Sequence, residues 1–589
     1  MSDIFKKNVF WWIISLLGFG LLTICYILAW HGKASYVLFW VGIGISCFSL
    51  LFVMLLSKDK KHILFSLFVL GLMIYSLQIY RSPEYFFSRD EMMHYQGYTS
   101  LIEKGNLRFN HTTYPIIKDY PGLELLVSST YFTTALNPIF SGRILIGLIH
   151  SVLLILLWIY FSKLGLSYNI ASIGTFIYAI NPRYTLFDSI VSYESVGIIF
   201  VILLLLLIKR MIDIRTMAFS ILAIITLLAL VITHHLSSYM FLIYSLILLI
   251  NYYTLDRLKN EESKRCLNAF IVLAGVFVFG WLIYVAMGST LSYLTLGFKD
   301  RILAILQLSI FGGEGERVMF IGSPVPLYER FISRFLYPPV LLFLCFYGGY
   351  LLLIKKILSL DILRLSLFFF GPVLFLTSWL LVPTTTGSEL AYRSWAFLFI
   401  GVAFTIAVAF KSITEKKGLY YRLALSFALI IMFFGGFSLS RNESIRFPAS
   451  RFVDNENFYT LQSFRAADWL SSRDSKGLKL LGTLPQRDVM GSYGGQYVDL
   501  LQTARFIVKD EVDFNVWQHY HYLAVDNRIT KLIYSMPKSY FGINLPEPYA
   551  NVGHVKPLPA YLLQKFNYCP AMLNVYDNGT VLLYRNVFL

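Results

Sequence analysis

The adjacent carboxylates Asp90 and Glu91 carry the clearest chemical signal in this sequence. They follow directly after an apolar stretch, and two neighbouring carboxylates at a membrane surface repel one another and lose hydration, which raises the proton affinity of at least one. Such a pair can supply a general base toward a hydroxyl group, or can hold a divalent cation. His94 follows Asp90 by one helical turn and would share its helix face. Ser88 followed by Glu91 also fits a capping box, so a purely structural role stays open.

The elements that must position these residues are membrane spans. Hydrophobic residues make up 57% of the 589, charged residues only 14%, and the mean hydropathy is +0.63, whereas soluble domains are about half apolar and a quarter charged. Because lipid-embedded backbone must satisfy its own hydrogen bonds, each apolar stretch predicts a helix, and about thirteen spans are expected. The stretches are 9–30, 35–56, 62–80, 143–162, 169–182, 193–208, 216–233, 237–254, 268–289, 336–354, 362–382, 394–410 and 421–439.

Basic residues cluster on alternate connections between these stretches, which predicts a cytoplasmic N-terminus. This orientation places 81–142, 183–192, 234–235, 290–335, 383–393 and everything after 440 outside. The net charge of +16 is then largely a topology signal, and no basic run typical of nucleic-acid binding is present. The five cysteines offer neither a disulfide framework nor zinc spacing.

The sequence divides into a membrane domain, 1–440, and a soluble α/β domain, 441–589, outside the membrane. In the second, we expect a helix at 464–470, a strand at 478–481 and a hairpin at 574–584 that turns on Asn-Gly. This domain would cover the outer cavity, select the acceptor or only stabilise the fold. The outer loop 290–335 contains a glycine-rich segment that is either a gate or a simple connection. Sequons for N-glycosylation begin at Asn110, Asn442 and Asn578.

The loop after the third apolar stretch resembles a known family. Its Asp-Glu pair is followed by the turn Gly105-Asn106-Leu107 and by Tyr120-Pro121-Gly122-Leu123-Glu124. This pattern is similar to the C-type membrane glycosyltransferases (GT-C), which use polyprenyl-phosphate-linked sugars and include protein mannosyltransferases and aminoarabinose transferases of lipid A. Two features depart from it. The acidic loop follows the third stretch where many relatives have it after the first, and Asp-Glu replaces the Asp-x-Asp of oligosaccharyltransferases, which favours transfer of a single sugar.

The resemblance implies roles for particular residues. Asp90 becomes the general base or the carboxylate that orients the acceptor, Glu91 its partner or a metal ligand, and Arg393 the residue that binds the donor phosphate. Arg393 equally suits an interface anchor, and the histidine pair equally suits a polar cap on a helical hairpin. Candidates to complete a cation site or to steer donor or acceptor are His94, Asp188, Glu194, His234 and His235. Rivals for the phosphate are Arg143, Arg183, Lys299, Arg301 and Arg334.

The function expected from this resemblance is transfer of a hexosyl or pentosyl group, with inversion, from a polyprenyl-phosphate donor. The acceptor would be a glycan, a lipid or a protein at the outer face of the plasma membrane, and a divalent metal ion is an open question. The alternatives are a flippase or transporter of lipid-linked glycans and a polymerase or ligase of surface polysaccharide. A transporter would need polar residues along its spans, whereas here they gather at one side.

Overall fold

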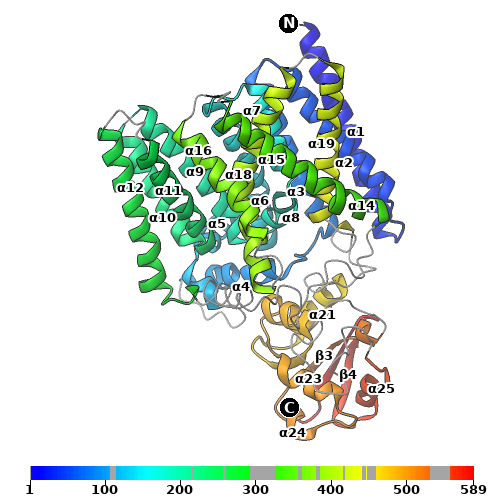
Figure 1. Ribbon diagram of the computed structural model, residues 1–589. Coiled ribbons are helices and arrows are strands. Elements are labelled where there is room, and N and C mark those ends of the chain that lie inside the picture. Colours follow the sequence, from blue (N-terminus) through cyan, green and yellow to red (C-terminus); the bar gives the residue numbers. More distant parts are fainter. Residues whose placement is uncertain are drawn as a thin grey trace, which may run out of the picture.

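The structure is a computed structural model of the chain. It describes residues 2–106, 115–214, 216–255, 261–291, 326–355, 358, 361–379, 385–415, 418–440, 446–447, 459–530 and 558–589. A large helical bundle holds the N-terminal part, and a small mixed sheet with its helices holds the C-terminal part (Figure 1). The predicted fold class, a helical membrane protein with a small C-terminal α/β unit, is confirmed.

Ten helices among the described residues are long and apolar enough to cross a membrane. They include or form part of α1 (Ser2–Trp30), α2 (Tyr36–Leu56), α3 (Lys60–Arg81), α6 (Pro138–Lys163), α9 (Tyr193–Ile214), α11 (His235–Leu255), α12 (Glu261–Gly280), α15 (Tyr337–Leu353), α18 (Thr385–Thr414) and α19 (Leu419–Ser440). The π-helical turn η3 (Trp281–Val285) extends α12, and α14 (Leu327–Phe331) with η4 (Ile332–Leu336) precedes α15.

The other predicted stretches are also helical but shorter. They form α7 (Tyr168–Ala179), α10 (Met217–Thr233) and the pair α16 (Ile362–Phe368) and α17 (Leu374–Ser378), joined by the π-helical turn η5 (Phe369–Val373). A helix rises about 1.5 Å per residue, so the 12 residues of α7 are too few to cross a bilayer core by themselves.

Short elements at one end of the bundle connect the long helices. They are α4 (Arg89–Lys104), η1 (Pro115–Asp119), α5 (Gly122–Thr134), α8 (Pro182–Leu186) and η2 (Phe187–Ser189). Helix α4 begins with the predicted capping box. The Ser88 hydroxyl accepts from the Glu91 N–H, and the Glu91 carboxylate accepts from the Ser88 N–H, both at 3.2 Å. This cap fixes the first turn of α4, which contains Asp90.

The C-terminal sheet has the strand order β2-β1-β3-β5-β4. Its strands are β1 (Lys479–Gly482), β2 (Tyr497–Asp499), β3 (Tyr522–Asp526), β4 (Met572–Asp577) and β5 (Val581–Asn586). Strands β2, β1 and β3 are parallel, whereas β5 is antiparallel to both β3 and β4. The helical elements around it are α21 (Leu461–Arg473), α22 (Leu484–Gln486), η7 (Arg487–Tyr493), α23 (Leu500–Val508), α24 (Phe514–Trp517), η8 (Asn527–Thr530), α25 (Tyr561–Gln564) and η9 (Lys565–Tyr568).

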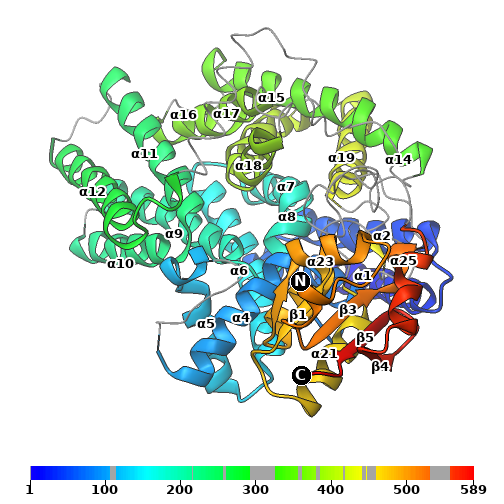
Figure 2. The same ribbon diagram turned by 90° about the horizontal axis from the view of Figure 1, so that it is seen from below.

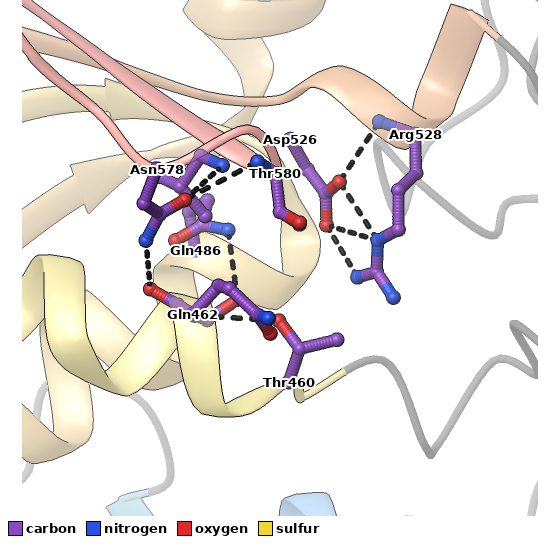
Figure 3. Close-up of polar contacts among 9 residues, drawn as sticks. Thr460, Gln462, Gln486, Asp526, Arg528, Asn578 and Thr580 are labelled. Atoms are coloured by element: carbon purple, nitrogen blue, oxygen red, sulfur yellow. Dashed lines mark hydrogen bonds and ion pairs between the residues drawn. The ribbon is translucent and has the colours of Figure 1, made fainter. Parts of the chain in front are cut away.

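The predicted helix, strand and hairpin of this part are all present, as α21, β1 and the pair β4–β5. The hairpin turns at Asn578-Gly579, where Gly579 has φ of 81°, a conformation that favours glycine. The Asn578 side chain donates to the Gln462 carbonyl at 2.8 Å and accepts from the backbone N–H groups of Thr580 and Val581 (Figure 3). Its amide therefore ties the hairpin to α21, and attachment of a glycan at this sequon would disrupt that tie. The other two sequons begin outside the described residues.

The C-terminal part packs against α4 and the segment before it. The Tyr85 ring stacks on Phe464 with centroids 4.3 Å apart, and Tyr95 lies 5.5 Å from Tyr493. One buried apolar cluster contains residues of both parts, among them Met92 and Phe464. Viewed from below, the sheet and its helices overlie the side of the bundle that contains α1, α2 and α4 (Figure 2). The helix that carries Asp90 is thus held between the bundle and the C-terminal part.

Candidate functional site

A small pocket lies at the end of the bundle where α4, α9 and α18 meet. It is lined by Asp90, Met93, His94, Phe187, Ser192, Tyr193, Glu194 and Arg393. Asp90 and Glu194 belong to the first turns of α4 and α9, where a carboxylate is favoured by the positive end of the helix dipole. Four of the residues singled out from the sequence, from three separate elements, therefore line one cavity.

Arg393 lies between two carboxylates in this pocket. Its Nη2 is 3.8 Å from Oδ2 of Asp90, and its Nη1 is 4.0 Å from Oε2 of Glu194. The Glu194 side chain is fully buried, Arg393 is 18% exposed and Asp90 is 34% exposed. Both separations exceed hydrogen-bond length, so these two contacts are Coulombic rather than a bidentate fork.

His94 is paired with a carboxylate of the neighbouring helix. Its Nδ1 lies 2.7 Å from Oε1 of Glu124, in the first turn of α5, and both side chains are buried. The Tyr193 ring meets His94 edge-on with centroids 4.7 Å apart. The imidazole is therefore fixed in orientation at the wall of the pocket.

His234 and His235 lie next to this wall. The Tyr193 ring contacts both, with centroids 4.3 and 5.9 Å away, and His234 Nδ1 is 2.6 Å from the Ser237 hydroxyl. Burial, together with the positive charge of Arg393 and the other histidines, holds the pKa of His234 well below its ordinary value. His234 is therefore neutral at physiological pH and serves as an aromatic and hydrogen-bonding neighbour.

Asp188 is buried behind the pocket, beside Arg183. Neither carboxylate oxygen has a hydrogen-bond partner within the described part of the chain, and burial raises the pKa of Asp188 to about 7 although Arg183 opposes the shift. The Arg183 guanidinium lies over the rings of Phe187 and Tyr392, at 5.4 and 5.2 Å. Arg183, one of the rival cations, is thus a near neighbour of Arg393.

Glu91 is turned away from Asp90. Its carboxylate accepts from the backbone N–H groups of Phe87, Ser88 and Val191, each at 3.2 Å, and it does not line the pocket. Burial raises the pKa of Glu91, while the nearby Arg143 and the three N–H groups oppose that shift. The expectation of a raised proton affinity in the pair is thus met by Glu91, and its cause is burial. These hydrogen bonds anchor α4 to the segment before α9 through the Glu91 side chain.

Two of the remaining rival cations, Arg143 and Arg334, do not line the pocket. The Arg143 guanidinium donates to the carbonyls of Ser82, Pro83 and Tyr85 at 2.5–2.6 Å, so it fixes the backbone before α4. Arg334 belongs to η4. Lys299 and Arg301, like the glycine-rich segment 312–316 and part of the Gly-Asn-Leu turn, lie outside the described residues.

Metal ligation was one use predicted for the acidic residues and the histidines. Within the described ranges, no three side chains of His, Cys, Asp or Glu are grouped so that they could hold a metal ion. Arg393 instead occupies the position between Asp90 and Glu194.

Sequence reasoning gave no role to Glu124 and Tyr193. Glu124 was visible only as the last residue of the Tyr-Pro-Gly-Leu-Glu segment, and its partner His94 is 30 positions earlier in the chain. An acidic residue in the first turn of a helix has an ordinary explanation in the helix dipole. A signal for the pairing would have required knowing that α4 and α5 pack side by side.

Comparison with known proteins shows the fold. No protein-family model matches the chain, and no curated protein resembles it in sequence. The apo oligosaccharyltransferase of Archaeoglobus fulgidus superposes with a TM-score of 0.50 and 11% identity, over 90% of this chain and 75% of that one. The arabinofuranosyltransferase AftD from Mycobacteria gives a TM-score of 0.49 and 11% identity over 90% of this chain, which spans 42% of AftD.

ArnT from Cupriavidus metallidurans, in a structure bound to undecaprenyl phosphate, gives a TM-score of 0.46 and 10% identity over 90% of this chain and 99% of ArnT. The chain has a GT-C-like fold, as the sequence resemblance predicted.

Proposed function

We propose that this chain is a membrane glycosyltransferase that transfers one sugar from a polyprenyl-phosphate-linked donor to an acceptor hydroxyl at the outer face of the plasma membrane. The observation that carries the proposal is the pairing of Asp90 with Arg393, 3.8 Å apart, in a pocket at one end of the spans. A carboxylate and a guanidinium there offer what sugar transfer from a phosphate requires, namely an acceptor for a hydroxyl proton or hydrogen bond and a fixed positive charge. The GT-C-like fold supports it.

In the proposed reaction, Arg393 binds the donor phosphate and Asp90 receives the hydrogen bond of the acceptor hydroxyl. The acceptor oxygen forms its bond to the anomeric carbon while the bond from that carbon to the phosphate oxygen breaks, and a single displacement inverts the configuration. Arg393 then faces the negative charge that grows on the departing phosphate, and Arg183 adds positive potential nearby. Glu194, buried against Arg393, keeps the guanidinium within reach of both.

The location of the pocket supports a lipid-linked donor. Sugar nucleotides are made in the cytoplasm, and the distribution of basic residues assigns this end of the bundle to the outer side. The sequence also lacks the glycine fingerprint of a dinucleotide-binding unit. A sugar carried across the membrane on a polyprenyl phosphate satisfies both observations. The assay below uses several donors and several acceptors. It therefore identifies the sugar as a hexose or a pentose and the acceptor as a glycan, a lipid or a protein.

The C-terminal part supports a role in acceptor selection because it contacts the catalytic helix directly. Arg89, the neighbour of Asp90, has its Nε 3.7 Å from Oδ2 of Asp488. An acceptor held by this part would thus lie close to Asp90.

The test is transfer by the full chain reconstituted in proteoliposomes with radiolabelled polyprenyl-phosphate sugars. We expect label to appear on an added glycan, lipid or peptide acceptor for at least one donor. Movement of intact labelled donor across the bilayer, with no label on any acceptor, would instead establish a flippase and overturn the proposal. A ladder of products of increasing length would establish a polymerase. Addition of a chelator to the same assay decides whether a divalent cation takes part.

A further inference from the structure

The buried pair of His94 and Glu124 resembles the base and orienting carboxylate of a proton-transfer dyad. A carboxylate in its ionised form can only accept hydrogen bonds, and with Glu124 in that form His94 Nδ1, 2.7 Å from Oε1, carries the proton and donates it. This fixes the tautomer and leaves Nε2 as the nitrogen with a free lone pair. His94 lines the pocket beside Asp90, where the proposed function brings the acceptor hydroxyl.

The surrounding structure is arranged to keep this geometry. Gly97, one turn after His94, faces Glu124, and a Cβ atom there would lie 3.1 Å from Cγ and 3.2 Å from Oε1 of Glu124. The absence of a side chain at Gly97 therefore gives the carboxylate its room. The Tyr193 ring supports the imidazole from the α9 side. Glu124 itself is fully buried, and its Oε2 has no hydrogen-bond partner in the described part of the chain, so the contact of Oε1 with His94 is what offsets the cost of burying this carboxylate.

We propose that His94, held by Glu124, takes up the proton of the acceptor hydroxyl, while Asp90 orients that hydroxyl. This proposal rests on the proposed function and names the proton acceptor within its site. As the acceptor oxygen bonds to the anomeric carbon, its proton moves to His94 Nε2. The electron pair of the cleaved carbon–oxygen bond leaves with the phosphate. Glu124 stabilises the imidazolium that forms, as an adjacent carboxylate does in other base dyads.

Charged and titratable groups near His94 come from several elements. They are Asp90 on α4, Glu124 on α5, Tyr193 and Glu194 on α9, His234 between α10 and α11, and Arg393 on α18. Of these, Glu124 is the one that hydrogen-bonds to the ring.

Two variants test the dyad in the proteoliposome assay across a range of pH. Glu124→Gln keeps the shape but removes the charge, so the imidazolium that forms during transfer loses its partner. We expect kcat to fall about 10²-fold or more, with little change in the donor KM, and the acid limb of the pH–rate profile to move to lower pH. His94→Asn retains an N–H donor toward Glu124 but lacks Nε2, and should lose the acid limb together with the rate. The matched control is Glu103→Gln, which alters an exposed carboxylate on α4.

The outcomes separate the two proposals. If the wild-type chain transfers no sugar from any donor, the proposed function fails and the dyad fails with it. If the wild type transfers and Glu124→Gln keeps both its kcat and its acid limb, the dyad alone is overturned. Should Glu124→Gln not fold, His94→Asn decides, since an unchanged acid limb in that variant also overturns the proposal.

Discussion

Burial of single carboxylates gives the site a pH dependence that can be measured. The pKa of Asp188 is raised by burial to about 7, so the folded chain binds its proton more tightly than the unfolded chain does. The contribution of protonated Asp188 to the free energy of unfolding is fully present below the ordinary pKa of an aspartate, and it is lost as the pH rises toward and through 7. We expect Asp188→Asn to remove this loss of stability, because asparagine does not titrate. Between pH 5 and pH 8, the thermal midpoint of the variant should therefore fall less than that of the wild type. Each unit by which folding raises a pKa corresponds to about 1.4 kcal/mol of folding free energy.

The control for this measurement is Asp213→Asn, because Asp213 pairs at the surface with Lys209, 2.7 Å away. Its pH dependence should match that of the wild type. An Asp188→Asn chain with an unchanged pH dependence of the midpoint would show that burial does not control this carboxylate.

Individual site residues were predictable from the sequence in part. The positive-inside pattern put Asp90, His94, Glu194 and Arg393 at one side, and the pocket brings these four together. Membrane topology sorts residues into two sides, so any ionisable residue at a turn becomes a candidate by this reasoning. It does not sort them within a side, and therefore it could not separate Arg393 from Arg143, whose guanidinium is occupied by backbone carbonyls.

At the scale of helices, the position of Glu124 depends on how closely α5 approaches α10. Gly122 begins α5, and a Cβ atom there would lie 2.7 Å from Cα of Thr233, the last residue of α10. Because backbone cannot yield as a side chain does, Gly122→Ala must push the two helices apart. We expect it to destabilise the fold by about 1–3 kcal/mol and to reduce kcat by displacing Glu124 from His94.

Gly44→Ala is the matched change, since a Cβ atom at Gly44 in α2 meets nothing within 4 Å. It should leave the thermal midpoint and kcat near their wild-type values. If Gly122→Ala behaves in the same way as Gly44→Ala, the close approach of α5 and α10 does not position the dyad.

Helix positions were the most predictable part of the fold. Each of the thirteen apolar stretches is a helix because lipid leaves the backbone no other way to pair its polar groups. Lengths were harder to predict. The stretch 169–182 is short for a span in the sequence, and α7 indeed has only 12 residues. The stretch 193–208 is also short in the sequence, yet α9 has 22 residues. Composition likewise does not show that η5 interrupts the pair α16–α17 at Pro372. Helix α4 was anticipated through its capping box, whereas nothing in the pattern indicated that Glu91 would also bind the N–H of Val191.

At the scale of the whole molecule, one buried carboxylate joins the C-terminal part to the helix that carries Asp90. Asp488 accepts from the Tyr459 hydroxyl at 2.7 Å and from Arg487 at 2.9–3.0 Å, and lies 3.7 Å from Arg89. Removing it leaves a buried hydroxyl without its acceptor, which costs about 1–3 kcal/mol. We expect Asp488→Ala to loosen this contact and to speed hydrogen exchange of the backbone amides in α4.

Lys476→Gln provides the comparison, because it breaks an exposed ion pair with Glu103 between the same two parts. Exposed pairs contribute about 0–1 kcal/mol, so exchange in α4 should stay at the wild-type rate. Equal exchange in the Asp488→Ala and wild-type chains would mean that the other contacts between the two parts, such as the stacking of Tyr85 on Phe464, hold α4 in place without Asp488.

The division into a helical bundle and a C-terminal sheet followed from composition, and the hairpin followed from its Asn-Gly turn. The docking of one on the other did not, because it depends on aromatic and charged residues nearly 400 positions apart, such as Tyr85 and Asp468, whose side chains lie 3.2 Å apart. Contacts between residues so far apart in the chain produce no periodic pattern in a single sequence.

The central claim is tested most directly by the effect of Asp90→Asn on sugar transfer in proteoliposomes, with Asp213→Asn as the control. We expect the wild-type and control chains to transfer label from a polyprenyl-phosphate sugar to an acceptor. We expect Asp90→Asn, folded and inserted as the wild type is, to transfer label about 10²–10⁴-fold more slowly. Transfer by Asp90→Asn at the wild-type rate would contradict the placement of the site in this pocket.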